Sequence, residues 1–165
     1  MKTILSEKVP RILKNKKRLE NKLNVKISNR GKEVQIDGKP EDEYIAEKVI
    51  DALNFGFPFS VAISIKEEGL EFEILNIKDH TKRKDLNRVR ARIIGKGGKT
   101  LKTLNHLTKC NFELKDNTIG IIGLPEYLEH AQESVISIIK GAKQSNVYSH
   151  LEKNQPKPII DLGLK

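Results

Sequence analysis

The chain contains an internal duplication, and this feature restricts its possible folds more than any other. The segment 34–41 matches the segment 119–126 at an offset of 85 residues, and the same offset pairs Gly56 with Gly141. Upstream of this match the offset falls to 81 residues, so the first copy is shorter in its loop region. A duplication of this kind indicates that one folding unit occurs twice in the 165 residues.

The second copy combines strand and helix patterns in the order β-α-α-β-β-α. Alternation of apolar and polar residues predicts strands over 70–77, 110–114 and 118–122. Apolar residues at helical spacing predict helices over 84–94, 99–108 and 125–140. Pro125 suits the first turn of the last helix, and Gly141 suits its C-terminal cap.

The first copy follows the same order. Its predicted strands cover 2–7, 25–28 and 33–36, and its predicted helices cover 9–14, 17–23 and 40–53. We therefore expect an α+β fold of two tandem units, each a three-stranded antiparallel sheet covered by helices. The aromatic run at 55–59 contains no basic residue, so we expect it to pack between the units rather than to stack bases. By alternation alone, 60–66 favours a strand.

Three glycines, Gly95, Gly97 and Gly98, interrupt a helical pattern that continues on both sides. Glycine permits positive φ and close approach of the backbone, so these residues predict a tight turn between two helices. The first N–H groups of the second helix, and the positive end of its dipole, would face a ligand above the turn. A phosphate fits such a place.

The basic charge of the chain surrounds this turn. Nine basic residues and one acidic residue, Asp85, lie between positions 81 and 102, so this segment carries +8 of the net +9. A solvated helix face normally mixes both signs of charge. A local excess of one sign is the electrostatic footprint of a site for nucleic acid.

Other classes of protein fit the sequence poorly. No apolar run approaches the roughly 20 residues that cross a bilayer, and the polar N-terminus does not resemble a secretory signal. The lone Cys110 excludes an internal disulfide and suits a reducing, cytoplasmic compartment, where we expect it to be a small core residue. The four histidines lack the spacing of metal ligands, so we expect neither a metal nor a cofactor.

Catalysis is also disfavoured. Gly98-Lys99-Thr100 resembles the end of a Walker A loop, but position 93 is isoleucine where that loop needs glycine, and no strand precedes the turn. Two binding alternatives remain open. One is a general chaperone of single-stranded nucleic acid, and the other is a protein adaptor whose units act as docking surfaces.

The second copy resembles a type I KH domain over its full length. Its glycine turn and the apolar residues on both sides match the GxxG core motif of that domain. The glycine-free first unit, the segments 54–57, 77–81 and 92–100, and the ending 146–152 narrow the resemblance. Together they are similar to the archaeal two-KH RNA-processing family, which is related to the eukaryotic small-subunit assembly factor called partner of Nob-one. The resemblance covers residues 2–153.

The resemblance implies a non-enzymatic role in maturing the small ribosomal subunit. Members of the family bind single-stranded RNA near the 3′ end of its rRNA and work beside a PIN-domain endonuclease on the pre-small-subunit particle. The resemblance also implies a helix over 58–66, although the alternation of apolar and polar residues in this segment favours a strand. The expected divisions are a degenerate KH-like domain at 1–57, a linker at 58–68, a KH domain with its GxxG loop at 69–153, and a mobile tail at 154–165.

We expect the N–H groups of residues 96–99 to contact phosphates and basic side chains to extend the positive track. The bases would lie in an apolar groove formed by Ile93 or Ile94 and one face of the strand at 111–115. The expected RNA-binding residues are Arg88, Arg92, Ile93, Ile94, Gly95, Lys96, Gly97, Gly98, Lys99, Lys102, Phe112 and Leu114. The first copy has Lys14-Asn15-Lys16-Lys17 at the corresponding turn, so we do not expect it to clamp RNA in the same way.

Overall fold

The computed structural model describes residues 1–155 as a stack of layers. Its first half contains β1 (Lys2–Leu5), α1 (Val9–Lys14), α2 (Lys16–Leu23), β2 (Lys26–Arg30), β3 (Glu33–Asp37) and α3 (Pro40–Phe55), followed by α4 (Phe59–Glu67). Its second half contains β4 (Glu71–Asn76), the 3-10 turn η1 (Ile77–His80), α5 (Leu86–Ile94), the 3-10 turn η2 (Lys96–Gly98), α6 (Lys99–Thr108), β5 (Asn111–Lys115), β6 (Thr118–Gly123), α7 (Pro125–Ile139) and α8 (Gln144–Lys153).

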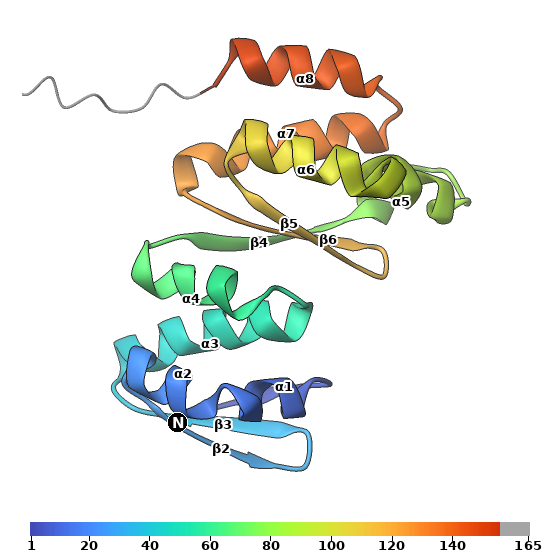
Figure 1. Cartoon of the computed structure of the whole chain (residues 1–165). Coiled ribbons are helices and arrows are strands. Elements are labelled where there is room, and N and C mark those ends of the chain that lie inside the picture. The colour runs from blue at the N-terminus through green and yellow to red at the C-terminus, as the bar shows by residue number, and fades with distance from the viewer. Residues whose placement is uncertain (156–165) are drawn as a thin grey trace, which may run out of the picture.

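Two three-stranded antiparallel sheets organise the fold, in the orders β1-β3-β2 and β4-β6-β5. In each sheet the last strand in sequence lies in the centre. Figure 1 shows the layers from the N-terminal end in the order first sheet, α1 to α3, α4, second sheet, α5 to α7, and α8. The mixed α+β class expected from the sequence is confirmed.

The segment after the first aromatic run is helical, as the resemblance implied and contrary to its alternation. In α4 the side chains of Ala62, Ile63 and Ile65 are buried in the same core as those of α1, α2, α3 and the first sheet. Burial of adjacent positions matches neither a solvated strand nor a loose linker. The helix therefore belongs to the body of the fold and lies between α3 and the second sheet (Figure 1).

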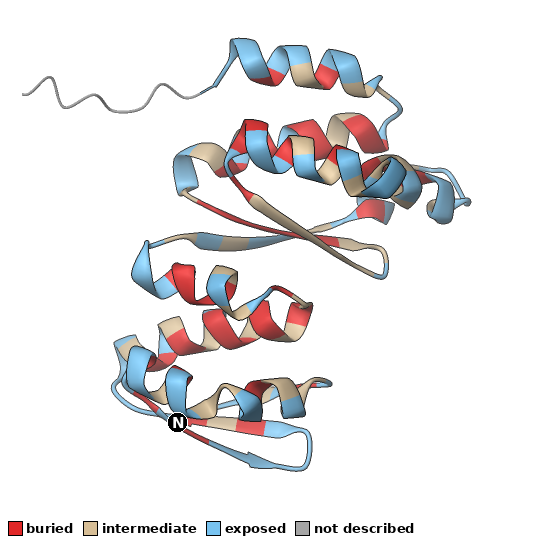
Figure 2. Ribbon diagram, viewed as in Figure 1, coloured by how far each residue is buried: buried red, intermediate tan, exposed pale blue. Residues whose placement is uncertain are grey.

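The central strand β6 of the second sheet is buried on both faces, unlike the central strand β3 of the first sheet. Ile119 and Ile121 of β6 face the core that α5, α6 and α7 cover, whereas Ile122 joins the core of the first half. In Figure 2 the central strand β6 is almost entirely buried, while β3 shows buried and exposed positions in alternation. This difference explains why β6 has a nearly continuous apolar sequence and β3 an alternating one.

An aromatic cluster joins the two halves. The ring centroids of Phe55, Phe57 and Phe72 lie 5.6 to 5.9 Å apart. Beneath them, a Cβ on Gly120 would lie 2.8 Å from Cε1 of Phe55 and 2.9 Å from Cε2 of Phe57. Glycine is therefore needed at this central position of β6 for the rings to reach the sheet. The prediction that the aromatic run packs between the units is confirmed for Phe55 and Phe57.

The sequence pattern missed α8. This helix buries Val147 and Leu151, which are one helical turn apart, against α6 and α7. Its buried apolar stripe is only two residues long, and most of its other residues are polar, so the periodic signal in the sequence is weak. Of the tail predicted at 154–165, the part from position 156 onward lies outside the described residues.

Candidate nucleic-acid interface

The glycine turn lies where α5 ends and α6 begins. Asp85 starts α5, because its carboxylate accepts a 3.3 Å hydrogen bond from the N–H of Arg88. The helix ends at Ile94, and Gly95 leaves it with φ 76° and ψ 171°. Gly97 and Gly98 follow with φ values of 63° and 77°. All three glycines therefore occupy the positive-φ region that other residues rarely adopt, as the sequence predicted.

The glycines have two different roles. A Cβ on Gly95 would lie 2.6 Å from the backbone N of Thr100, so this glycine allows the turn to close against the start of α6. At Gly97 and Gly98 a Cβ would meet no heavy atom within 4 Å. The outer surface of the turn is therefore open, and no other part of the described chain covers it.

Only some amides of the turn are free for a ligand. The N–H of Gly98 donates to the carbonyl of Gly95 at 3.1 Å, and the N–H of Lys99 donates to the carbonyl of Lys96. Within residues 1–155, the N–H groups of Lys96 and Gly97 make no backbone hydrogen bond. The set of four amides expected from the sequence is thus reduced to two that can bind a ligand without first breaking a bond.

A shallow groove of about 240 Å³ runs beside α5. Its lining comes from one face of α5 and from the end of the β5–β6 hairpin, and comprises Asn87, Arg90, Ala91, Ile94, Leu114 and Asp116. Ile94 is 38% exposed, whereas Ile93 is fully buried in the second core. The sequence left open which isoleucine lines the groove. The structure selects Ile94, and the inclusion of Ile93 among the contact residues is wrong.

The two strand residues expected in the groove behave differently. Leu114 lines it, but Phe112 packs against the second core without contributing to the groove wall. The structure therefore does not place Phe112 in this groove. Four lining residues were not in the predicted set, namely Asn87, Arg90, Ala91 and Asp116. Helical spacing could have indicated the first three, because they share a face of α5 with Ile94.

Arg92 is the main correction to the predicted basic track. Its guanidinium donates to the carbonyl oxygens of Ile138 at 2.9 Å and Ala142 at 2.6 Å. These acceptors lie at the C-terminal end of α7 and in the turn that follows it. The partly buried side chain thus fills a structural role that its basic charge alone did not reveal.

The other predicted cations remain accessible. Arg88, Lys96, Lys99 and Lys102 are exposed, and none of them forms an ion pair within residues 1–155. Arg90, in contrast, donates to the carbonyl of Asp116 at 3.2 Å and to the side-chain oxygen of Asn87. It therefore ties the groove wall to the β5–β6 turn. A positive potential without paired acids surrounds an open turn and a partly apolar groove.

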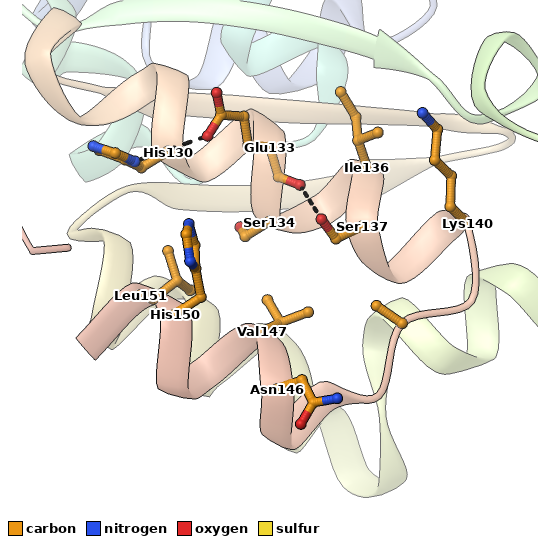
Figure 3. Close-up of a pocket in the computed structure, with 11 residues that line it drawn as sticks. His130, Glu133, Ser134, Ile136, Ser137, Lys140, Asn146, Val147, His150 and Leu151 are labelled. Carbon is orange, nitrogen blue, oxygen red and sulfur yellow. Dashed lines mark hydrogen bonds and ion pairs between the residues drawn. The ribbon is translucent and has the colours of Figure 1, made fainter. Parts of the chain in front are cut away.

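A separate cavity of about 470 Å³ lies between α7 and α8, on elements other than those that form the turn and groove. Figure 3 shows side chains of both helices around it, including His130, Ser134 and His150. Nδ1 of His130 lies 3.9 Å from the Glu133 carboxylate. Residues 1–155 contain no group of three or more histidine, cysteine or acidic residues placed to hold a metal ion. None of their helices is both long and apolar enough to cross a membrane.

Comparison with known proteins identifies the second half. The family model for the second KH domain of PNO1 proteins, described as a eukaryotic type KH-domain (KH-domain type I), matches residues 71–156. The chain belongs to this family. In the structure the KH domain contains the glycine turn, the groove and all the residues predicted to contact RNA.

Curated relatives agree with this KH family. A KH domain-containing protein of Methanocaldococcus jannaschii is 28% identical over 154 residues, which is 86% of this chain and 66% of that protein. The pre-rRNA-processing protein PNO1 of Saccharomyces cerevisiae is 32% identical over 139 residues, which is 79% of this chain and 51% of that protein. The chain thus spans between half and two thirds of the length of these relatives.

Solved structures extend the likeness across both halves. Dim2p of Pyrococcus horikoshii matches with a TM-score of 0.84 and 25% identity, covering 92% of this chain and 98% of that chain. The same organism's aDim2p, solved in an a/eIF2alpha-aDim2p-rRNA complex, matches with a TM-score of 0.82 and 26% identity over 92% of each chain. The KH domain of this protein therefore lies in the same two-sheet framework as a protein solved with rRNA.

Proposed function

We propose that this protein binds single-stranded RNA through its glycine turn and acts in maturation of the small ribosomal subunit, at the 3′ end of the 16S-type rRNA. The observation that carries the proposal is the open surface over Gly97 and Gly98, beside a groove that exposes Ile94. Names of relatives support the biological setting, because they include pre-rRNA-processing proteins. The rRNA in the complex of the P. horikoshii neighbour supports the ligand class.

The proposed mechanism divides the work between charge and shape. The free N–H groups of Lys96 and Gly97, at the positive end of α6, contact a phosphate. Lys96, Lys99, Lys102 and Arg88 add a salt-dependent attraction along the backbone. One or more unstacked bases lie against Ile94 and Leu114, where the polar groups of Asn87 and Asp116 offer hydrogen bonds to base edges.

We propose the division of the chain expected from the sequence, with residues 1–57 as a degenerate KH-like domain and 69–153 as the RNA-binding KH domain. In the first unit only Asn15 separates α1 from α2, and its side-chain amide donates to the carbonyl of Arg11 at 3.1 Å. This one-residue connection has no glycine and no positive-φ residue, since Asn15 has φ −103°, so it lacks the bend by which the glycine turn exposes its backbone. That unit serves as a docking platform, and the segment 58–68 joins it rigidly to the second unit through α4.

The proposed partners follow from the same setting. They are the rRNA of a pre-small-subunit particle in the cytoplasm and a PIN-domain endonuclease that cleaves near the site where this protein binds. The KH domain contributes binding and placement of the RNA, while the partner contributes the chemistry of cleavage. No catalytic role is assigned to the protein's own side chains.

The decisive experiment replaces Lys96 and Gly97 by aspartate and measures RNA binding by fluorescence anisotropy at moderate salt. Two negative charges on the phosphate path should lower affinity for an rRNA 3′-end fragment by about tenfold or more. A variant with Lys26 and Asn29 changed to aspartate, both exposed on strand β2, makes the same change in net charge and serves as the control. Unchanged affinity of the turn variant would exclude this site.

The choice of RNA tests the biological part of the proposal. The wild-type protein should bind the 3′-end fragment more tightly than a scrambled RNA of equal length and composition. Equal affinity for both would instead support a general chaperone of single-stranded nucleic acid. If the protein bound neither RNA but retained a partner after nuclease treatment, the adaptor function would replace both.

A further inference from the structure

A second basic surface lies next to the glycine turn, on segments that the groove does not use. The loop at 81–85 precedes α5, and the turn at 140–143 joins α7 to α8. A Cβ on Gly141 would lie 3.9 Å from Nη2 of Arg83, so the two segments are neighbours. Figure 1 shows both at the same end of the second half as α5. We call this surface the basic shoulder, and its residues are Lys82, Arg83, Lys84, Lys140 and Lys143.

The shoulder is connected directly to the glycine turn. Arg92 lies in the last turn of α5, three residues before Gly95, and binds the carbonyls of Ile138 and Ala142. The side chain of Gln144 donates back to the carbonyl of Arg92 at 3.4 Å. These hydrogen bonds place Lys140 and Lys143 beside the end of α5. Arg92 and the groove residue Ala91 are adjacent in the helix, about 100° apart around its axis, so shoulder and groove flank α5 on different sides.

Residues 1–155 contain no ion-pair partner for the charges of the shoulder. All five cations are exposed, and none forms an ion pair within the described chain. Asp85 is the only acid between 80 and 102, and its carboxylate caps α5 by accepting from the N–H of Arg88. No acid occurs between 134 and 151. The acid that most closely precedes the segment 80–102 in the sequence is Asp79 in η1. A local excess of basic charge without acids is the electrostatic footprint of a polyanion site.

The cations are also not needed to neutralise the end of α7. A helix C-terminus attracts basic side chains because its last carbonyl groups lack partners and carry partial negative charge. Here Arg92 already occupies two acceptors at that end, the carbonyls of Ile138 and Ala142. Lys140, Lys143 and Arg83 therefore add positive potential beyond what the fold itself uses. Such an excess fits a ligand with repeated negative charges.

We infer that the basic shoulder is a second phosphate-binding surface, which holds the nucleotides that flank those in the groove. This inference rests on the proposed binding of RNA at the glycine turn. Single-stranded RNA that leaves the groove across Lys96 and Gly97 meets the α7–α8 turn next, and its phosphates continue over Arg83. The shoulder adds affinity for longer RNA without reading bases, since its exposed cations provide charge but no fixed pocket.

The test compares two RNAs that share the same core sequence. One has about four nucleotides, the number that a GxxG loop clamps, and the other about twelve. The shoulder variant carries Arg83→Glu, Lys140→Glu and Lys143→Glu. It should bind the long RNA about tenfold more weakly than wild type and the short RNA with nearly unchanged affinity. Its salt dependence on the long RNA should be less steep by about 0.7 for each phosphate that the variant no longer neutralises.

Two controls separate this inference from the proposed function. Lys26→Glu, Arg30→Glu and Lys39→Glu make the same change in net charge on exposed residues of the first half, and this variant should bind both RNAs nearly as wild type. Lys96→Asp with Gly97→Asp should weaken binding of both RNAs. Weaker binding of the long RNA alone by the shoulder variant supports the shoulder. If the shoulder variant binds the long RNA as wild type does, or binds both RNAs equally weakly, the inference is wrong.

Failure of the proposed function gives a different pattern of affinities. If the turn variant keeps both affinities, the proposed function fails whatever the shoulder variant does. Circular dichroism and urea unfolding establish that each variant is folded. Should charge reversal unfold the protein, Arg83→Gln, Lys140→Gln and Lys143→Gln remove the same charges without adding negative ones, and the same comparison of RNA lengths then decides.

Discussion

Arg92 donates a 2.6 Å hydrogen bond to the carbonyl oxygen of Ala142, fifty residues later in the chain. The bond joins the helix that precedes the glycine turn to the connection between α7 and α8. It thereby links the position of the glycine turn to the C-terminal helices of the KH domain. The structure thus gives an arginine of the basic segment a positioning role.

Substitution of Arg92 by glutamine should therefore destabilise the protein. It removes bonds from a charged donor to two carbonyls, which should lower the free energy of unfolding by about 1–3 kcal/mol. Urea unfolding followed by circular dichroism measures this change. The matched control is Arg88→Gln, an exposed cation one turn earlier, which should alter stability by less than about 0.5 kcal/mol. Equal stability of both variants would contradict the structural role of Arg92.

The glycines of the turn should differ in their tolerance of alanine. Gly95→Ala places a Cβ 2.6 Å from the backbone N of Thr100 and also strains a residue with φ 76°. Gly97→Ala meets open space and costs only the left-handed conformation, about 1–2 kcal/mol. We expect Gly95→Ala to lower the urea midpoint clearly more than Gly97→Ala. The reverse order would show that the turn does not close against α6 as described.

Gly120 should be essential for the junction between the halves. Alanine at this position puts a Cβ within 3 Å of the Phe55 and Phe57 rings, and overpacking of this kind costs about 1–3 kcal/mol. Thermal unfolding should begin at a lower temperature. Ile122→Val, which trims a buried neighbour in the same strand, serves as control and should cost about 0.5–1.5 kcal/mol. A neutral Gly120→Ala would mean that the rings do not reach β6.

The thiol of Cys110 should resist alkylation in the folded protein. The side chain is fully buried beneath Gly123, and burial raises its pKa to about 11, with the Thr108 hydrogen bond acting in the opposite direction. Because the thiolate is the reactive form, labelling by iodoacetamide at pH 8 should be slow compared with that of the urea-unfolded chain. Rapid labelling of the folded protein, detected by mass spectrometry, would contradict this environment.

Asp51 should make stability depend on pH. Burial raises the pKa of this carboxyl, and the nearby Glu47 raises it further, whereas Lys48 lowers it. The folded state thus binds a proton more tightly than the unfolded state does. The resulting stability is present below the ordinary pKa of 3.8 and is lost as pH rises through the folded value. Asp51→Asn should therefore raise the urea midpoint at pH 7 and have little effect at pH 3. A lower urea midpoint of Asp51→Asn at pH 7 would contradict a raised pKa of Asp51.

The elements of the KH domain were largely predictable because local patterns and core packing agree there. The helices around Gly95 and the strands around Asp116 and Asn117 have strong periodicity and clear turn residues. Segment 59–67 did not have such agreement, since its alternation favoured a strand and only the resemblance implied a helix. Burial between α3 and the second sheet makes nearly every side chain of α4 apolar or small, and this removes the periodic signal.

The amino-acid sequence by itself determined the duplication, the α+β class, and a glycine turn within a basic segment, because each depends on residue types at short spacing. Tertiary structure alone decided which cations are free. It directs Arg92 to the carbonyls of Ile138 and Ala142, buries Ile93 while exposing Ile94, and brings Arg83 beside Gly141. The physical reason is that charge and hydrophobicity belong to a residue, whereas its partners depend on chain segments that only folding brings together.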